Sequence, residues 1–94
     1  MFEARISDSG EICLTGRLDA SQTDKAEKVL QQITFSKTIN FQELEYISSA
    51  GLGVLLANQK RLKSIGHGFR LINMNKHIRD IFALTGFDKV FEVL

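Results

Sequence analysis

Segments with the apolar period of a β-strand alternate with segments of helical period along almost the whole chain, and this alternation restricts the fold more than any other feature. Residues 2–18 predict a β-hairpin, because apolar and polar residues alternate on both sides of a Gly-containing turn. Three segments with apolar residues at helical spacing and three apolar strands follow. The expected helices cover about 21–33, about 49 to a stop at Gly66, and the stretch from an Asn75 cap to Gly86, and the expected strands cover 37–41, 69–74 and 90–94.

The element order β-β-α-β-α-β-α-β predicts an α/β fold with right-handed crossovers and a mixed, mostly parallel sheet. A chain of 94 residues has room for one domain, so residues 1–94 are expected to form a single one. In sheets of this kind, ligands and partners favour the loops at the carboxyl ends of strands. The segment 48–53 follows the third strand and is therefore expected at that edge.

Charge and composition exclude several classes of function. Twelve basic residues against eleven acidic ones give a net charge of +1, which does not favour direct nucleic-acid binding, although residues 1–47 carry −3 and residues 48–94 carry +4. No apolar stretch approaches the length of a membrane span, and the first residues lack the pattern of a signal peptide. With a single cysteine and two histidines ten residues apart, we expect a cytoplasmic protein without membrane insertion, disulfide, metal or cofactor.

The junction between the third strand and the second helix is the most informative stretch, and it reads Tyr46-Ile47-Ser48-Ser49-Ala50-Gly51-Leu52-Gly53. A serine at a helix start can cap a free backbone N–H, and two glycines can expose backbone to a partner or a phosphate. The simpler interpretation is an ordinary cap with closely packed glycines. Three known motifs do not match this stretch. It lacks the third glycine of a dinucleotide-binding fingerprint, the Gly-Lys-Ser/Thr of a P-loop and the Gly-x-Ser-x-Gly nucleophile elbow of a serine hydrolase.

An acidic residue, Asp19, closes the second strand just before the first helix. It either stabilises the loop and the helix start, or lies near Ser49, where it could bond the serine hydroxyl or repel a phosphate attached to it. The helix itself is predicted to begin with a capping box formed by Ser21 and Asp24.

Three stretches together resemble a STAS domain of the anti-sigma factor antagonist type. They are Gly16-Arg17-Leu18-Asp19-Ala20, then Leu44 through Leu56, then Leu84-Thr85-Gly86-Phe87-Asp88-Lys89-Val90-Phe91. The resemblance runs from end to end. It implies a module without catalysis of its own that binds an anti-sigma factor, itself a serine protein kinase, when dephosphorylated. Phosphorylation by that kinase reverses the interaction and a serine phosphatase restores it, so that transcription is regulated.

The resemblance also implies the site residues. The family's phosphoacceptor falls on Ser49, with Ser48 as the fallback, because Ser48 stands where the family usually has Asp. The implied partner-binding residues are Asp19, Ser48, Ser49, Ala50, Gly51, Leu52 and Gly53.

Two other kinds of function stay open from the sequence. A STAS domain of this size could be a scaffold in a signalling complex without a sigma factor, or a subunit of a lipid-transport assembly. A small enzyme or nucleotide-binding protein that uses Ser49 or the glycines is the remote alternative, because so short a chain has little interior for a pocket.

Overall fold

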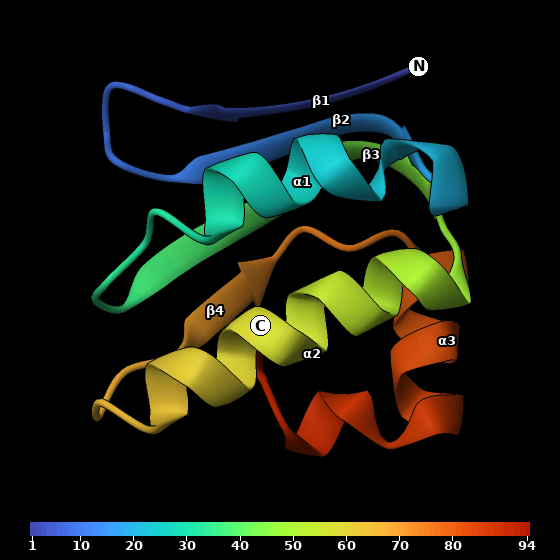
Figure 1. The fold of residues 1–94 in the computed structure, drawn as a ribbon. Coiled ribbons are helices and arrows are strands. Elements are labelled where there is room, and N and C mark those ends of the chain that lie inside the picture. The colour runs from blue at the N-terminus through green and yellow to red at the C-terminus, as the bar shows by residue number, and fades with distance from the viewer.

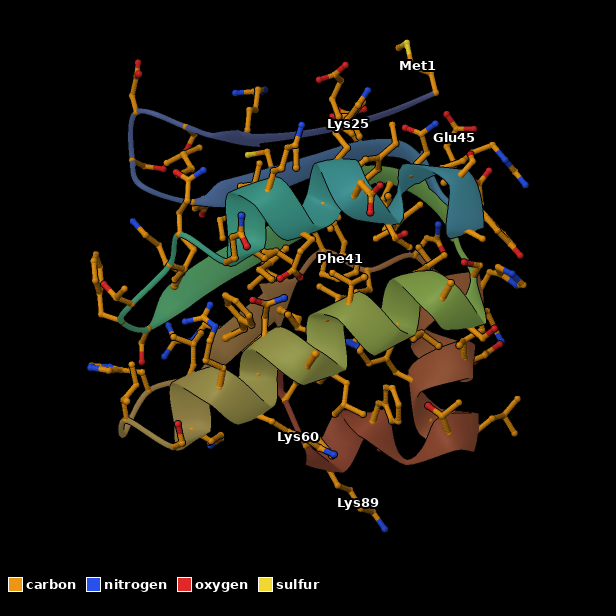
Figure 2. The ribbon with its side chains drawn as sticks, viewed as in Figure 1. Met1, Lys25, Phe41, Glu45, Lys60 and Lys89 are labelled. Carbon is orange, nitrogen blue, oxygen red and sulfur yellow. The ribbon has the colours of Figure 1, made fainter.

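A computed structural model describes residues 1–94, and its centre is a five-stranded sheet with the order β1-β2-β3-β4-β5 (Figure 1). The strands are β1 (Phe2–Ile6), β2 (Ile12–Leu18), β3 (Lys37–Ile47), β4 (Phe69–Ile72) and β5 (Glu92–Val93). The helices are α1 (Thr23–Leu30), α2 (Ser49–Lys63) and α3 (Lys76–Thr85), with single 3-10 turns η1 (Ala20–Gln22) and η2 (Phe87–Lys89). Only β1 and β2 are antiparallel, so the predicted α/β order and the mostly parallel sheet are confirmed.

Helices α1 and α2 pack side by side on one face of the sheet, as Figure 1 shows. Successive side chains of a strand point to opposite faces, so one set can be buried while the other remains accessible. On β2 and β3 the buried set includes Ile12, Leu14, Ile39 and Phe41, which belong to one continuous hydrophobic core with residues of all three helices. The alternate positions are half-buried or exposed, and half-buried Asn40 is one of them.

Strand β3 is more than twice as long as the predicted segment 37–41. Its pairing with β2 is irregular at two places, where Cys13 and Thr15 face Asn40 and Glu43, and where the register shifts again after Gly16. Each irregularity is a bulge that places an extra residue on β3 and breaks the alternation of buried and exposed positions. The sequence pattern therefore loses its period of two after Phe41, although the strand continues to Ile47.

The start of the first helix also differs from the prediction. The expected capping box of Ser21 and Asp24 is wrong, because α1 begins after Gln22 without a side-chain cap. Asp19 instead caps the 3-10 turn η1 by accepting a hydrogen bond from the backbone N–H of Ser21. The chain thus enters α1 through a tighter turn that the period of apolar residues cannot reveal. The other predicted boundaries agree to within a few residues, although β5 is only two residues long.

A polar network fixes α2 against the end of α1. Arg61 donates from Nη1 to the carbonyl oxygen of Ile33 and from Nη2 to that of Leu30, at 2.8 and 2.9 Å. The buried Asn58 amide donates to Glu27 Oε1 at 2.8 Å. The Arg61 bonds engage the carbonyl group of Leu30, the last residue of α1, and that of Ile33 just beyond it. The network therefore fixes where α2 lies, and with it the position of the first turn of α2. No helix of the structure combines the length and the apolar character that crossing a membrane requires.

Candidate functional site

The carboxyl ends of β2 and β3 lie next to each other and create the site. Leu18 pairs with Ile47 in the last register position, and the backbone N–H of Ser48 donates to the Leu18 carbonyl oxygen at 2.9 Å. Asp19 and Ser48, the residues that follow the two strands, therefore lie at the same edge of the sheet. This is the edge at which parallel sheets place their binding loops.

Ser48, and not Ser49, is the N-cap of α2. Its backbone is extended, with φ −92° and ψ 171°, and its Oγ accepts a hydrogen bond from the Gly51 N–H at 3.2 Å. The carbonyl oxygen of Ser48 accepts from the Leu52 N–H at 2.9 Å. The N–H groups of Ser49 and Ala50 are those that the first turn leaves without an intrahelical partner. The stabilising role of a cap hydroxyl thus belongs to Ser48.

Ser49 is the first residue of α2, and its side chain is exposed. Its hydroxyl takes part in no hydrogen bond within the chain, in contrast to the hydroxyl of Ser48. Ala50 and Gly53 are also exposed, so the accessible part of the loop consists of these residues and half-buried Ser48. A chemical group added to Ser49 would therefore lie in solvent beside two unpaired backbone donors.

The two glycines of the loop have different environments. Gly51 is buried, and a Cβ there would lie 2.8 Å from Leu18 Cγ, 2.9 Å from the Leu18 carbonyl oxygen and 3.0 Å from Ile47 Cγ1. At Gly53 a Cβ would meet nothing within 4 Å. Leu52 is 6% exposed and belongs to the core. Gly51 and Leu52 thus hold α2 close to the ends of β2 and β3, whereas Gly53 leaves its backbone open to solvent.

The carboxylate of Asp19 is engaged with its own turn. Its Oδ1 accepts from the Ser21 hydroxyl at 2.6 Å and from the Ser21 N–H at 3.0 Å. The hydroxyl bond is the main cause that lowers the pKa of Asp19 below its ordinary value, and nearby Arg17 contributes in the same direction. Asp19 is therefore a fixed negative charge at this edge, and its hydrogen bond goes to Ser21 and not to Ser49.

The start of α3 reaches the same edge, and no sequence motif indicates that it belongs to the site. Asn75 caps α3 through a 2.8 Å bond from the Ile78 N–H to its Oδ1, and its Nδ2 donates to the Leu44 carbonyl oxygen on β3 at 3.3 Å. The signal available in the sequence was the Asn75 cap alone, which gives no indication of the contact with β3. No three His, Cys, Asp or Glu side chains lie close enough together to hold a metal ion.

Comparison with known proteins identifies the family. The family model described as "Mlab, STAS domain" matches residues 1–94, the full length of this chain. The chain belongs to the STAS domain family. The resemblance found in the sequence is therefore confirmed, and the arrangement of β3 and α2 around Ser48 and Ser49 is part of a STAS domain.

Individual relatives agree with this assignment. This STAS domain is 34% identical over 74 residues to BtrV of Bordetella bronchiseptica, described as a candidate anti-sigma factor antagonist; the match covers 79% of this chain and 58% of that protein. An anti-sigma factor antagonist from Mycobacterium paratuberculosis has a similar fold, with a TM-score of 0.82, 21% identity, and coverage of 99% of this chain and 83% of that one. The Bacillus protein SpoIIAA in its phosphorylated form gives a TM-score of 0.70 at 18% identity, covering 100% and 91%.

The contrast between the two loop glycines of this STAS domain predicts opposite effects of the same substitution. Gly51→Ala forces a methyl group against Leu18 and Ile47, so we expect it to lower the free energy of unfolding by about 1–3 kcal/mol. Gly53→Ala should raise it by about 0.5–1 kcal/mol, because alanine loses less conformational freedom in a helix than glycine. Urea unfolding followed by circular dichroism measures both. Equal effects of the two substitutions would contradict the packing described for Gly51.

Proposed function

We propose that this STAS domain is an anti-sigma factor antagonist that acts by phosphorylation-controlled partner switching and so regulates transcription. The dephosphorylated form binds an anti-sigma factor that is also a serine kinase. Phosphorylation of Ser49 by that kinase releases it, and a serine phosphatase resets the switch. The names of the relatives support the class of function. The observation that carries the mechanism is the exposed Ser49 hydroxyl, free of internal hydrogen bonds at the start of α2.

Ser49 is a better acceptor than Ser48 for a structural reason. A kinase needs a hydroxyl that can enter its active site, and the Ser48 hydroxyl is half-buried and bonded to the Gly51 N–H. Phosphorylation of Ser48 would remove or distort the cap, which is ordinarily worth about 1 kcal/mol. The Ser49 hydroxyl caps no backbone group, so its phosphorylation would remove no such bond. The fallback site at Ser48 is therefore the less favourable of the two.

The fold tolerates a phosphate on Ser49. The group carries about −1.5 to −2 charges at neutral pH, and the N-terminal end of a helix favours negative charge. The unpaired N–H groups of Ser49 and Ala50 can donate to its oxygen atoms. The phosphorylated chain should thus keep the same structure, and the difference between the two states lies in the surface that a partner contacts.

That surface consists of Ser49, Ala50 and Gly53 on α2 together with Ser48 and Asp19 at the strand ends. In the dephosphorylated form it is largely uncharged apart from the Asp19 carboxylate. A phosphate adds a second, stronger negative charge at the same edge. A partner that packs on this surface would have to desolvate that charge or leave it unpaired, and both cost binding free energy.

The experiment that tests this function is mass spectrometry of the intact protein, and of its peptides, purified from its native cells in growth and under stress. We expect a mass increase of about 80 Da, the mass of one phosphoryl group, on the peptide containing Ser49 in at least one condition. A Ser49→Ala variant expressed in the same cells is the control and should lose the modification. Consistent absence of phosphate would contradict the switch and favour a constitutive STAS scaffold or subunit.

A further inference from the structure

A basic cleft lies at the end of the sheet opposite Ser49, where β3 and β4 begin. It has a volume of about 640 Å3. Its walls are the loop before β3, the loop before β4, the first residues of these strands, and side chains of α2 and β5. Lys37 and Phe69 are register partners there, so the cleft spans the junction of two parallel strands. Lys63, the last residue of α2, lines the cleft, whereas Ser49 is the first residue of the same helix. The proposed partner switch therefore makes no use of it.

The charged side chains around the cleft are mostly cationic. Lys37, Lys63 and Arg70 carry positive charges, and Glu92 is the only carboxylate. Glu92 is paired with Arg70, with 3.2 Å between Glu92 Oε2 and Arg70 Nε. Neither lysine lies within ion-pair distance of a carboxylate. The Lys37 ammonium lies 4.9 Å from the centroid of the Phe35 ring at one side of the cleft, a contact that leaves its charge in place. The cleft thus has an excess of positive charge that no group of the chain neutralises.

Hydrogen bonds fix the walls of the cleft. The Gly68 N–H donates to Ser36 Oγ at 3.2 Å, and the same oxygen lies 3.3 Å from His67 Nδ1. Behind them, the amide of Gln59, 1% exposed, accepts from the Phe69 N–H at 2.8 Å. A Cβ at position 68 would lie 3.4 Å from Lys63 Cε, so the missing side chain leaves space for the lysine stem. These contacts join the two loops before any ligand is bound, which lowers the cost of ordering them.

The nearby end of α2 does not cancel this positive charge. The C-terminal end of a helix ordinarily disfavours anions, because its last carbonyl groups are free. In this chain the last four carbonyl oxygens of α2 all accept hydrogen bonds from the residues that follow or from a side chain: Lys60 and Arg61 from Ser64, Leu62 from Ile65 and His67, and Lys63 from Gly66. The last carbonyl groups of α2 are therefore bonded within the chain and do not face an anion in the cleft as free acceptors.

We propose that this cleft binds a compact polyanion of the linear oligophosphate class. Lysine and arginine side chains are the usual partners of phosphoryl groups, and a chain of several phosphates can contact the separated cations at once. Phe69 is the only hydrophobic residue of the lining and is itself 2% exposed. The cleft thus offers no apolar surface on which a nucleobase or an acyl chain could pack. Its volume lies within the range of small-ligand sites.

The test is a titration of the isotope-labelled protein with sodium tripolyphosphate at low ionic strength, followed by two-dimensional NMR of the backbone amides. We expect saturable shifts confined to the residues that line the cleft, namely 36–38, 59, 63, 66–70 and 92. The double variant Lys37→Gln/Lys63→Gln should weaken binding by about tenfold, because it removes two of the cations that the phosphates would contact. The matched control Lys28→Gln/Lys89→Gln removes the same charge from exposed positions that do not line the cleft, and it should bind like the original chain.

Further arms of the titration separate the possible sources of the phosphates. ATP and tripolyphosphate should shift the same amides to similar extents, and adenosine should shift none, because the cleft recognises phosphoryl groups alone. Stronger binding of adenosine or of an oligo-glutamate peptide than of tripolyphosphate would overturn the proposal. It would also be overturned by an equal loss of binding in the control variant, which would indicate general charge attraction, or by shifts centred on residues 49–53. None of these results depends on phosphorylation of Ser49.

Discussion

An aspartate at position 49 should weaken binding of the anti-sigma factor by more than about a hundredfold. The carboxylate places a permanent negative charge on an exposed position beside Asp19, where the partner is proposed to pack. Desolvation of a charged group without a partner costs several kcal/mol, and a loss of about 3 kcal/mol corresponds to more than a factor of one hundred in affinity. Isothermal titration of the kinase-type anti-sigma factor from the same cells with Ser49→Asp and the original chain measures the difference.

Two variants make this result specific. Ser49→Ala should bind like the original dephosphorylated chain and resist release by the kinase with ATP, and its stability should be unchanged because the cap hydroxyl belongs to Ser48. Thr34→Asp adds the same charge at an exposed position in the loop between α1 and β3 and should leave binding intact. Binding of Ser49→Asp with the affinity of the original chain would show that Ser49 is not the switch.

Truncation of Phe82 should cause the largest loss of stability among these substitutions. Phe82 is fully buried, and its ring contacts three others edge-on: Phe41 on β3 at 6.1 Å between centroids, Phe91 at 5.8 Å and Phe87 at 6.4 Å. It therefore joins α3 to the sheet and to the C-terminal segment. Phe82→Ala should lower the free energy of unfolding by about 3–5 kcal/mol, a large part of the stability of a small domain.

Urea unfolding followed by far-UV circular dichroism measures this loss. Leu84→Ala is the matched control on the same helix, because Leu84 is 87% exposed and its truncation should change stability by less than about 0.5 kcal/mol. If Phe82→Ala does not fold, Phe82→Leu gives a smaller and still measurable loss of about 1–1.5 kcal/mol. Equal stability of the two alanine variants would contradict the position of α3 on the core.

Much of this fold could be predicted from local patterns. The hairpin, the three helices and the order of the strands along the chain follow from the spacing of apolar residues. The end of α3 at Gly86 follows from the ease with which glycine adopts a left-handed backbone, and Gly86 has φ 79°. The predictions that differ concern β3 and the start of α1. In β3, bulges opposite β2 interrupt the alternation, and at the start of α1, Asp19 caps a 3-10 turn in place of Ser21. The bulges depend on pairing between two distant segments. The cap of the 3-10 turn is a local bond from Ser21 to Asp19, which the period of apolar residues does not indicate.

In the candidate site, too, some features follow from the local sequence and others only from contacts between segments. The sequence placed Ser48 and Ser49 at a helix start, but either hydroxyl could have been the cap. The structure makes Ser48 the cap, because its N–H is bound to the Leu18 carbonyl oxygen at the end of β2 and its side chain is thereby directed to Gly51. It also distinguishes Gly51 from Gly53, which look equivalent in the sequence, because only Gly51 lies against Leu18 and Ile47.

The sequence by itself therefore determined the element order, the family and the segment in which the switch is proposed, since periodicity and motifs are local properties of a chain. The tertiary structure decided which hydroxyl is free, which glycine is required for packing, and that Lys37 and Lys63 share one cleft although they are distant in sequence. These properties depend on which strands pair and therefore on which strand ends lie next to each other. Pairing of β2 with β3 and of β3 with β4 brings together residues that no local pattern connects.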